Sequence, residues 1–190
     1  VEGLLHDVNS KTESLDLTQE QKTEIAKRAI NESEKTRSEL VDRKDIDNPT
    51  LNNRMEQARD LSIDTDVAKH KLKLHASEAT EQKIKDYNHV LSQEQKDDLH
   101  KQTTDLSHKQ LDEEIGKGTT VYSARRKVDQ NMKSHANTAA EGIIVNDIKL
   151  AKKNLVHEIM NVRKFLADGE ALKSSQTRLY KINEYREKLN

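Results

Sequence analysis

A six-residue sequence occurs twice in this 190-residue chain, as LTQEQK beginning at Leu17 and as LSQEQK beginning at Leu91. The two copies lie 74 residues apart, a distance typical of a whole structural module rather than of one helical turn or strand. Each copy has the order of a helix capping box, in which a Thr or Ser hydroxyl and a Gln side chain satisfy amides at the helix start. We therefore predict helices that begin after Thr18 and Ser92, with the preceding leucines as hydrophobic staples, and prefer this interpretation to a ligand-binding loop.

The correspondence continues beyond the hexapeptide at the same offset. The matched pairs are Ile25 with Leu99, Ser33 with Ser107, Lys35 with Lys109, and Val41 with Ile115. The turn that follows differs in length, DRKDIDNPT in the first copy and GKGTT in the second, which indicates an insertion in a loop. In the first turn, Asn48 suits an N-cap and Pro49 the first helical position. In the second turn, Gly116 suits the residue that ends a helix in the left-handed backbone conformation.

Composition favours an all-α fold. Charged residues make up 35% of the chain, hydrophobic residues 32% and aromatic residues 3%, with one proline and five glycines. This amino-acid composition is typical of helical proteins, but it supplies too few large side chains for one thick core. Turn signals occur at 15–18, 45–50, 90–92, 116–120 and 167–169, and the segments between them are predicted to be helical.

A long helix is predicted after each of these two turns, at 50–90 and at 119–166. Each is long enough to contribute to two bundles. Forty helical residues span about 60 Å. We therefore predict elongated tandem three-helix bundles that share these connector helices. The predicted modules are residues 1–66, residues 67–142 and a partial third module at 143–190, in which Leu172, Leu179, Ile182 and Leu189 form an apolar stripe and a third helix is lacking. A single parallel coiled coil is the competing interpretation, and the frequent turns argue against it.

Charge and cysteine content exclude several function classes. Lys and Arg number 33 against 34 acidic residues, and the two signs are interspersed, so neither a nucleic-acid footprint nor a basic membrane-binding face is predicted. No apolar run approaches the length of a membrane span. The chain has no cysteine, which excludes a disulfide framework and thiolate chemistry. Because VEGLLHDVNS begins without Met or a signal peptide, we expect the chain to be an excerpt of a longer protein.

The stretch LSQEQKDDLHKQTTDLSHKQLDEEIGKGTTVYSARRKVDQNMKS resembles a helical repeat of unknown function in giant wall-anchored staphylococcal surface proteins of the extracellular matrix-binding type. Residues 91–135 match the order of that repeat, and 17–62 match it with a longer turn. Residues 143–190 depart from it, because LADGEALKSS stands where the cap is expected. The resemblance implies a rod or stalk module on the bacterial cell wall, a monomer in a longer repeat array, with roles in biofilm and in attachment to host matrix proteins such as fibronectin.

Catalytic chemistry has little support in the sequence. His70 and His75 lie five residues apart and His100 and His108 eight apart, and neither spacing places two imidazoles on one coordinating face of a helix. We expect solvent-facing or boundary histidines. Adjacent acids such as Asp97–Asp98 point about 100° apart, and SARR lies inside a helix rather than in a phosphate-binding loop. The chain is therefore predicted to be no enzyme, with no catalytic, cofactor-binding or metal-binding residues.

The aromatic residues are the candidates for binding, because exposed aromatic side chains commonly anchor protein partners. The chain has only Tyr87, Tyr122, Phe165, Tyr180 and Tyr185, several of them near predicted corners, where hinge or core packing is the alternative role. Tyr180 and Tyr185 are the candidate anchors if both are exposed. Two functions follow: a repeat-built spacer stabilised by contacts between neighbouring modules, or a helical module that itself recognises a host matrix or plasma protein.

Overall fold

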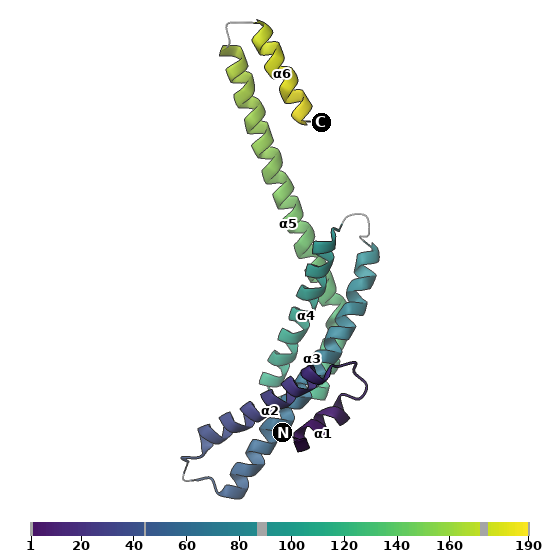
Figure 1. Ribbon diagram of the computed structural model, residues 1–190, viewed down its shortest axis with the longest axis vertical. Coiled ribbons are helices and arrows are strands. Elements are labelled where there is room, and N and C mark those ends of the chain that lie inside the picture. The colour runs from purple at the N-terminus through teal and green to yellow at the C-terminus, as the bar shows by residue number, and fades with distance from the viewer. Residues whose placement is uncertain (1, 44, 87–90, 172–174, 190) are drawn as a thin grey trace. The chain divides into compact units, whose positions relative to one another are not determined.

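The computed structural model describes residues 2–43, 45–86, 91–171 and 175–189, and those residues form six helices (Figure 1). No strand occurs in these ranges, so the predicted all-α class is confirmed. The helices are α1 (Glu2–Lys11), α2 (Gln19–Leu40), α3 (Asn48–Asp86), α4 (Gln93–Gly116), α5 (Val121–Ala171) and α6 (Ser175–Leu189).

The chain divides into two compact units, Val1–Ala140 and Glu141–Asn190. The first unit holds α1 to α4 and the start of α5, and the second holds the rest of α5 and α6. The finer division of the first unit into modules at 1–66 and 67–142 stays a prediction.

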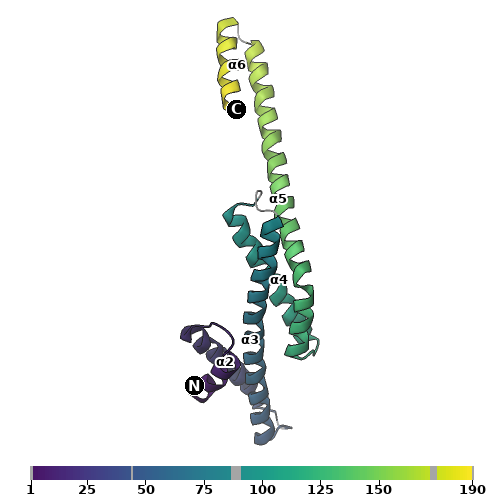
Figure 2. The same ribbon diagram turned by 90° about the vertical axis from the view of Figure 1, so that its right-hand side faces the viewer.

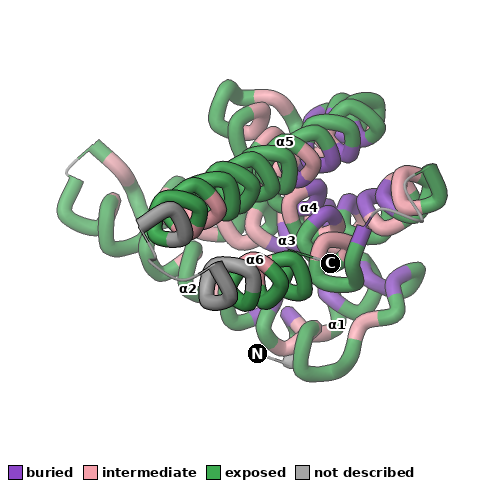
Figure 3. The backbone as a smooth tube through the Cα atoms, turned by 90° about the horizontal axis from the view of Figure 1, so that it is seen from above, coloured by how far each residue is buried: buried purple, intermediate pink, exposed green. Residues whose placement is uncertain are grey.

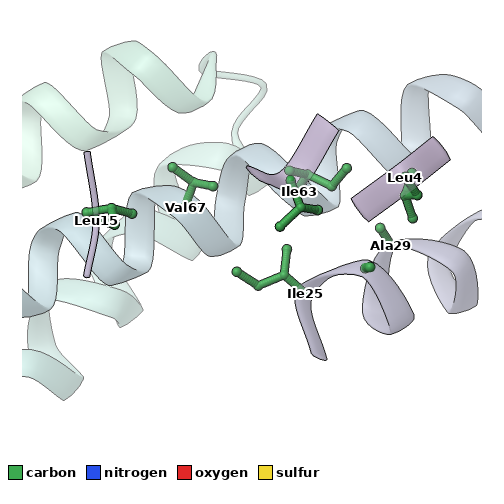
Figure 4. Close-up of a cluster of buried hydrophobic side chains, with 8 residues drawn as sticks. Leu4, Leu15, Ile25, Ala29, Ile63 and Val67 are labelled. Carbon is green, nitrogen blue, oxygen red and sulfur yellow. The ribbon is translucent and has the colours of Figure 1, made fainter. Parts of the chain in front are cut away.

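One hydrophobic cluster of the first unit draws on α1, α2 and α3 (Figure 4). Its buried members are Leu4, Val8, Leu15, Ile25, Ala26, Ala29, Ile63 and Val67. Leu17, which precedes the first capping box, packs against this cluster, so the corner between α1 and α2 is tied to the core. Figure 4 places Ile25 and Ala29 of α2 opposite Ile63 of α3.

A second cluster draws on α3, α4 and α5. Its buried members are Ala68, Leu72, Ala76, Leu111, Ala124, Val128 and Met132. The adjacent residues Val67 and Ala68 belong to different clusters. Successive helical side chains point about 100° apart, so one helix can serve two cores on different sides. α3 thus contributes to both clusters within the first unit.

Both predicted capping boxes are present. The Thr18 hydroxyl accepts from the Gln21 amide at 3.2 Å, and the Gln21 side chain accepts from the Thr18 amide at 2.9 Å. At the second site Ser92 and Gln95 make the same pair of bonds at 3.2 and 2.7 Å. Each reciprocal pair satisfies two of the four amides that a helix start leaves without a partner.

The predicted ends around the two turns were each misplaced by one or two residues. Asp47, not Asn48, caps α3, because its Oδ1 accepts from the Thr50 amide at 2.9 Å. Gly118, not Gly116, takes the left-handed conformation, with φ of 86°. The amides of Gly118 and Thr119 donate to the carbonyls of Ile115 and Glu114, the two bonds that end a helix in a Schellman motif.

The break predicted at 167–169 was wrong, because α5 continues to Ala171. A glycine inside a helix costs only about 1 kcal/mol relative to alanine, so Gly169 alone does not stop a helix that is favoured on both sides. The first helix is shorter than predicted and ends at Lys11. The Thr12 hydroxyl then donates to the Val8 carbonyl at 2.6 Å, which satisfies one of the last carbonyls of α1.

In the second unit, α6 turns back beside the end of α5 (Figure 2). Phe165 of α5 and Tyr185 of α6 stack with their ring centroids 4.7 Å apart. Seen from above, most of the described residues of α6 and much of α5 are exposed (Figure 3). Of the apolar stripe predicted for α6, Leu172 and Leu179 lie outside the residues whose side chains are described, Ile182 is half-buried and Leu189 is exposed.

Candidate binding surface

The two predicted anchor residues have different surroundings. Tyr180 is 72% exposed, whereas Tyr185 is half-buried against Phe165. Five residues of helix turn the chain through about 500°, which leaves the two tyrosines about 140° apart around α6. The structure therefore brings Tyr185 together with Phe165 and not with Tyr180. A binding role for the tyrosines stays a prediction.

The remaining aromatic residues do not join them. Tyr122, near the start of α5, is 68% exposed and lies in the first unit. Tyr87 lies outside the described residues.

Exposed large hydrophobic residues are most numerous on the part of α5 that belongs to the second unit. We define the apolar row as the residues that follow one another there at spacings of three and four: Ile144, Ile148, Ala151, Leu155, Ile159, Val162 and Leu166. Ile144 and Val162 are half-buried, and the other five are exposed. The sequence predicted a helix over these residues but not that this row is exposed, so its exposure is the functional feature that sequence reasoning missed.

A second row lies beside the apolar row, one residue later at each step. We define this basic row as Val145, Lys149, Lys152, Val156, Met160 and Arg163. All six residues are exposed, and within the described part of the chain none of the three cations forms an ion pair. Lys153 and Lys164 add positive charge next to this row.

The apolar row has acidic residues on the side that faces away from the basic row. Between 145 and 166 the only acids are Asp147 and Glu158. Both fall in the row that includes Phe165, which stacks on α6. The apolar surface of α5 therefore has one flank that faces α6 and one flank that carries positive charge.

A polar cluster around the buried Asp66 links α2, α3 and α4 in the first unit. Asp66 of α3 is 8% exposed, and its Oδ1 accepts from Arg28 of α2 at 3.2 Å. Lys69 of α3 pairs with Asp112 of α4 at 2.8 Å, and His108 of α4 donates through Nε2 to the Lys69 carbonyl at 3.0 Å. These contacts connect the helices that build the two hydrophobic clusters.

Burial changes the pKa of two groups in this cluster. It raises the pKa of the Asp66 carboxyl, although Arg28 and Lys69 oppose the shift. The second carboxyl oxygen of Asp66 has no hydrogen-bond partner among the described residues. Burial also lowers the pKa of His70, and Asp66 opposes that shift. Because sequence spacing does not show which charges from distant helices meet, the cluster had no local sequence signal.

A shallow groove between α3 and α5 contains a His–Asp pair, with His75 Nδ1 2.7 Å from Asp129 Oδ1. Such a pair can act as a base in hydrolysis when a hydroxyl or thiol nucleophile lies beside it. No Ser, Thr or Cys is among the described residues that line the groove. The pair joins two helices of the second cluster, which gives it a structural role.

Metal ligands are not gathered in the described part of the chain, where no group of three or more His, Cys, Asp or Glu side chains could hold an ion. The prediction of solvent-facing or boundary histidines is confirmed for the seven described ones, which are all exposed or half-buried. The eighth, His89, lies outside the described residues.

Comparison with known proteins identifies no relative: no family model, curated protein or solved structure matches the chain. Among the described helices, none combines the length and the apolar character needed to cross a membrane.

Proposed function

We propose that this chain is a non-catalytic repeat segment of a bacterial cell-surface adhesin, in which it acts as a rod or stalk. The observation that carries the proposal is the capped corner built twice, at Thr18 and again at Ser92, with the same reciprocal hydrogen bonds. Two such helix starts, 74 residues apart, are what an array of similar modules would contain.

The two clusters of the first unit support the same proposal. Each draws on three helices, and α3 supplies residues to both. Neighbouring modules that share a helix have no flexible linker between them about which to rotate. Such an array is therefore stiff, as a stalk requires. The location on the cell wall, and the role in biofilm and matrix attachment, are proposed from the resemblance to staphylococcal surface repeats.

Small-angle X-ray scattering of the monomeric chain tests the stalk. A compact chain of this length has a radius of gyration of about 16 Å by the usual size scaling. A clearly larger value, with a rod-like distance distribution and strongly helical circular dichroism, is the expected result. A value near the compact one would reject the stalk, because the connector helices would then fold back on each other.

A second candidate function is direct recognition of a host matrix or plasma protein, favoured by the exposure of Tyr180 and of the apolar row of α5. Its test is surface plasmon resonance of the chain over immobilised fibronectin, with Tyr180→Ala as the variant and Tyr122→Ala as the matched control. Direct recognition requires saturable binding that only Tyr180→Ala weakens. Absence of saturable binding would leave the spacer as the function of this segment.

A further inference from the structure

We propose that the apolar row and the basic row of α5 form a docking surface for an amphipathic helix whose own apolar seam is flanked by acidic residues. The docked helix is supplied from outside residues 1–190. This inference names a partner that the stalk proposal leaves open, and the docking surface itself lies within the second unit.

The first observation is the concentration of exposed apolar side chains. Fourteen large hydrophobic residues are exposed in the described part of the chain, and eight of them lie between 145 and 166. They are Val145, Ile148, Leu150, Leu155, Val156, Ile159, Met160 and Leu166, and all of them except Leu150 belong to the apolar row or the basic row. Scattered exposed apolar residues are normal on a protein surface, but a contiguous patch marks an interaction site.

The spacing of the row indicates that its occupant is a helix. Steps of three and four residues keep side chains on one side of an α-helix and form the seam that a second helix packs against. An extended peptide alternates with a period of two and would not follow this seam. From Ile144 to Leu166 the row extends about 33 Å, which several turns of helix are needed to cover.

The second cluster of this same chain shows how such a surface is covered. There α3 and α4 pack together, and Ala124, Val128 and Met132 of α5 fill the face between them at steps of four residues. In the second unit α6 packs against one flank of α5 through the Phe165–Tyr185 stack, and five of the seven residues of the apolar row remain exposed. A third helix on the apolar row would give this unit the three-helix packing of the second cluster.

The charge of the basic row selects an acidic partner. A helix seated on the apolar row would remove water from Lys149, Lys152 and Arg163, and desolvated cations without partners destabilise a complex. Acidic side chains beside the partner's seam would pair with them. The second cluster uses this device, since Asp112 of α4 follows the cluster residue Leu111 and its carboxylate lies 2.8 Å from the Lys69 ammonium of α3.

The same charges disfavour a second copy of this chain as the occupant. Antiparallel pairing of two apolar rows about a two-fold axis near Val156 would place Lys149 of one copy beside Arg163 of the other. Like charges juxtaposed at an interface lower affinity. The surface is therefore suited to a partner of opposite charge.

Two synthetic helical peptides test the proposal with the full 190-residue chain. Both carry the same leucine seam at steps of three and four, and the flanking positions are Glu in one peptide and Lys in the other. Isothermal titration calorimetry at low salt is expected to give an affinity roughly tenfold higher for the Glu peptide, because three cations gain partners. Added salt should narrow this difference by screening.

Variants of the chain locate the peptide. Leu155→Lys should abolish binding, whereas Leu74→Lys, a similarly exposed leucine in the first unit, should leave it unchanged. The double variant Lys152→Glu with Arg163→Glu should reverse the preference between the peptides. Circular dichroism of each variant checks that helicity is kept, as expected for exposed positions.

Two outcomes would overturn the proposal. One is equal affinity for the two peptides, or no binding of either, at concentrations where the chain is monomeric. The other is a concentration-dependent dimer in sedimentation velocity that Leu155→Lys dissociates, which would make a second copy the occupant. Neither outcome bears on the radius of gyration that tests the stalk.

Discussion

Ile25 and Leu99, 74 residues apart in the chain, occupy equivalent places in two different helices. Each lies seven residues after its N-cap, Thr18 or Ser92, and each is fully buried. The two positions show that the repeat extends from the local hydrogen bonds of the cap to side chains that pack in the interior.

Truncating these side chains is the first prediction. Ile25→Ala and Leu99→Ala should each lower the free energy of unfolding by about 2–5 kcal/mol, because each removes buried methyl groups and leaves a cavity. Urea unfolding followed by circular dichroism measures the loss.

The matched controls are Lys27→Ala and Lys101→Ala, which stand at the same offset and are exposed. They should change stability by less than about 0.5 kcal/mol. If the two buried truncations cost no more than these controls, the equivalence of the interior positions would be refuted.

The second prediction concerns the capping boxes. Thr18→Ala and Ser92→Ala should each cost about 1 kcal/mol, since both leave the N3 amide without its hydroxyl acceptor. The exchanges Thr18→Ser and Ser92→Thr keep the acceptor and should be close to neutral. Thermal unfolding of the four variants checks this, and equal losses in the Ala and exchange variants would argue against capping as the cause.

The caps show which part of the fold could be predicted from sequence. A capping box depends on residues three apart, so Thr18 and Ser92 could be placed without knowledge of tertiary structure. The end of α5 could not, because a glycine is a weak stop and the flanking residues decide whether the helix continues to Ala171. The cap at Asp47 competed with its neighbour Asn48, and both residue types suit that role.

The third prediction compares two glycines of one turn. Gly118→Ala should destabilise the chain by about 1–2 kcal/mol, because an L side chain is strained at φ of 86° even though no neighbour crowds the site. Gly116→Ala should stabilise it by about 0.5–1 kcal/mol, since Gly116 is helical and an added methyl group would meet no neighbouring atom. Thermal unfolding distinguishes the two, and a reversed order would contradict the observed helix end.

The fourth prediction is a pH dependence due to Asp66. Burial raises the pKa of its carboxyl in the folded chain above the ordinary value of 3.8. When the pKa of a carboxyl is higher in the folded chain than in the unfolded chain, protonation stabilises the folded state. This contribution is fully present at pH below the unfolded-state pKa and is lost as pH rises through the folded-state pKa. The unfolding free energy of the native chain, relative to Asp66→Asn, should therefore increase as pH falls from 7 to 4.

Arg28→Gln provides the companion variant for this measurement. Arg28 opposes the effect of burial on the Asp66 pKa, so its removal should strengthen the pH dependence. Urea unfolding at several pH values gives the slopes. Parallel pH curves for the native chain and Asp66→Asn would show that burial does not shift this carboxyl.

The candidate surface was harder to predict than the fold because its residues carry a core-like pattern. The apolar row has a helical spacing like that of the buried residues Leu72 and Ala76 of α3, which lie four residues apart. Spacing reports which residues share a face of a helix, and only the packed structure reports whether another helix covers that face. Tyr180 and Tyr185 illustrate the same limit. They are close in the sequence, yet they lie on different sides of α6.

The fifth prediction separates those two tyrosines. Tyr185→Ala should destabilise the docking of α6 by about 1–2 kcal/mol, because it removes a stacked and half-buried ring, whereas Tyr180→Ala removes a ring that is 72% exposed and should be near neutral. Hydrogen exchange of the α6 amides measures the effect. Phe165→Ala should lower protection as Tyr185→Ala does, and the double variant should lose little more, because the two rings form one contact. Additive losses, or an equal loss for Tyr180→Ala, would mean that the stack does not hold α6 on α5.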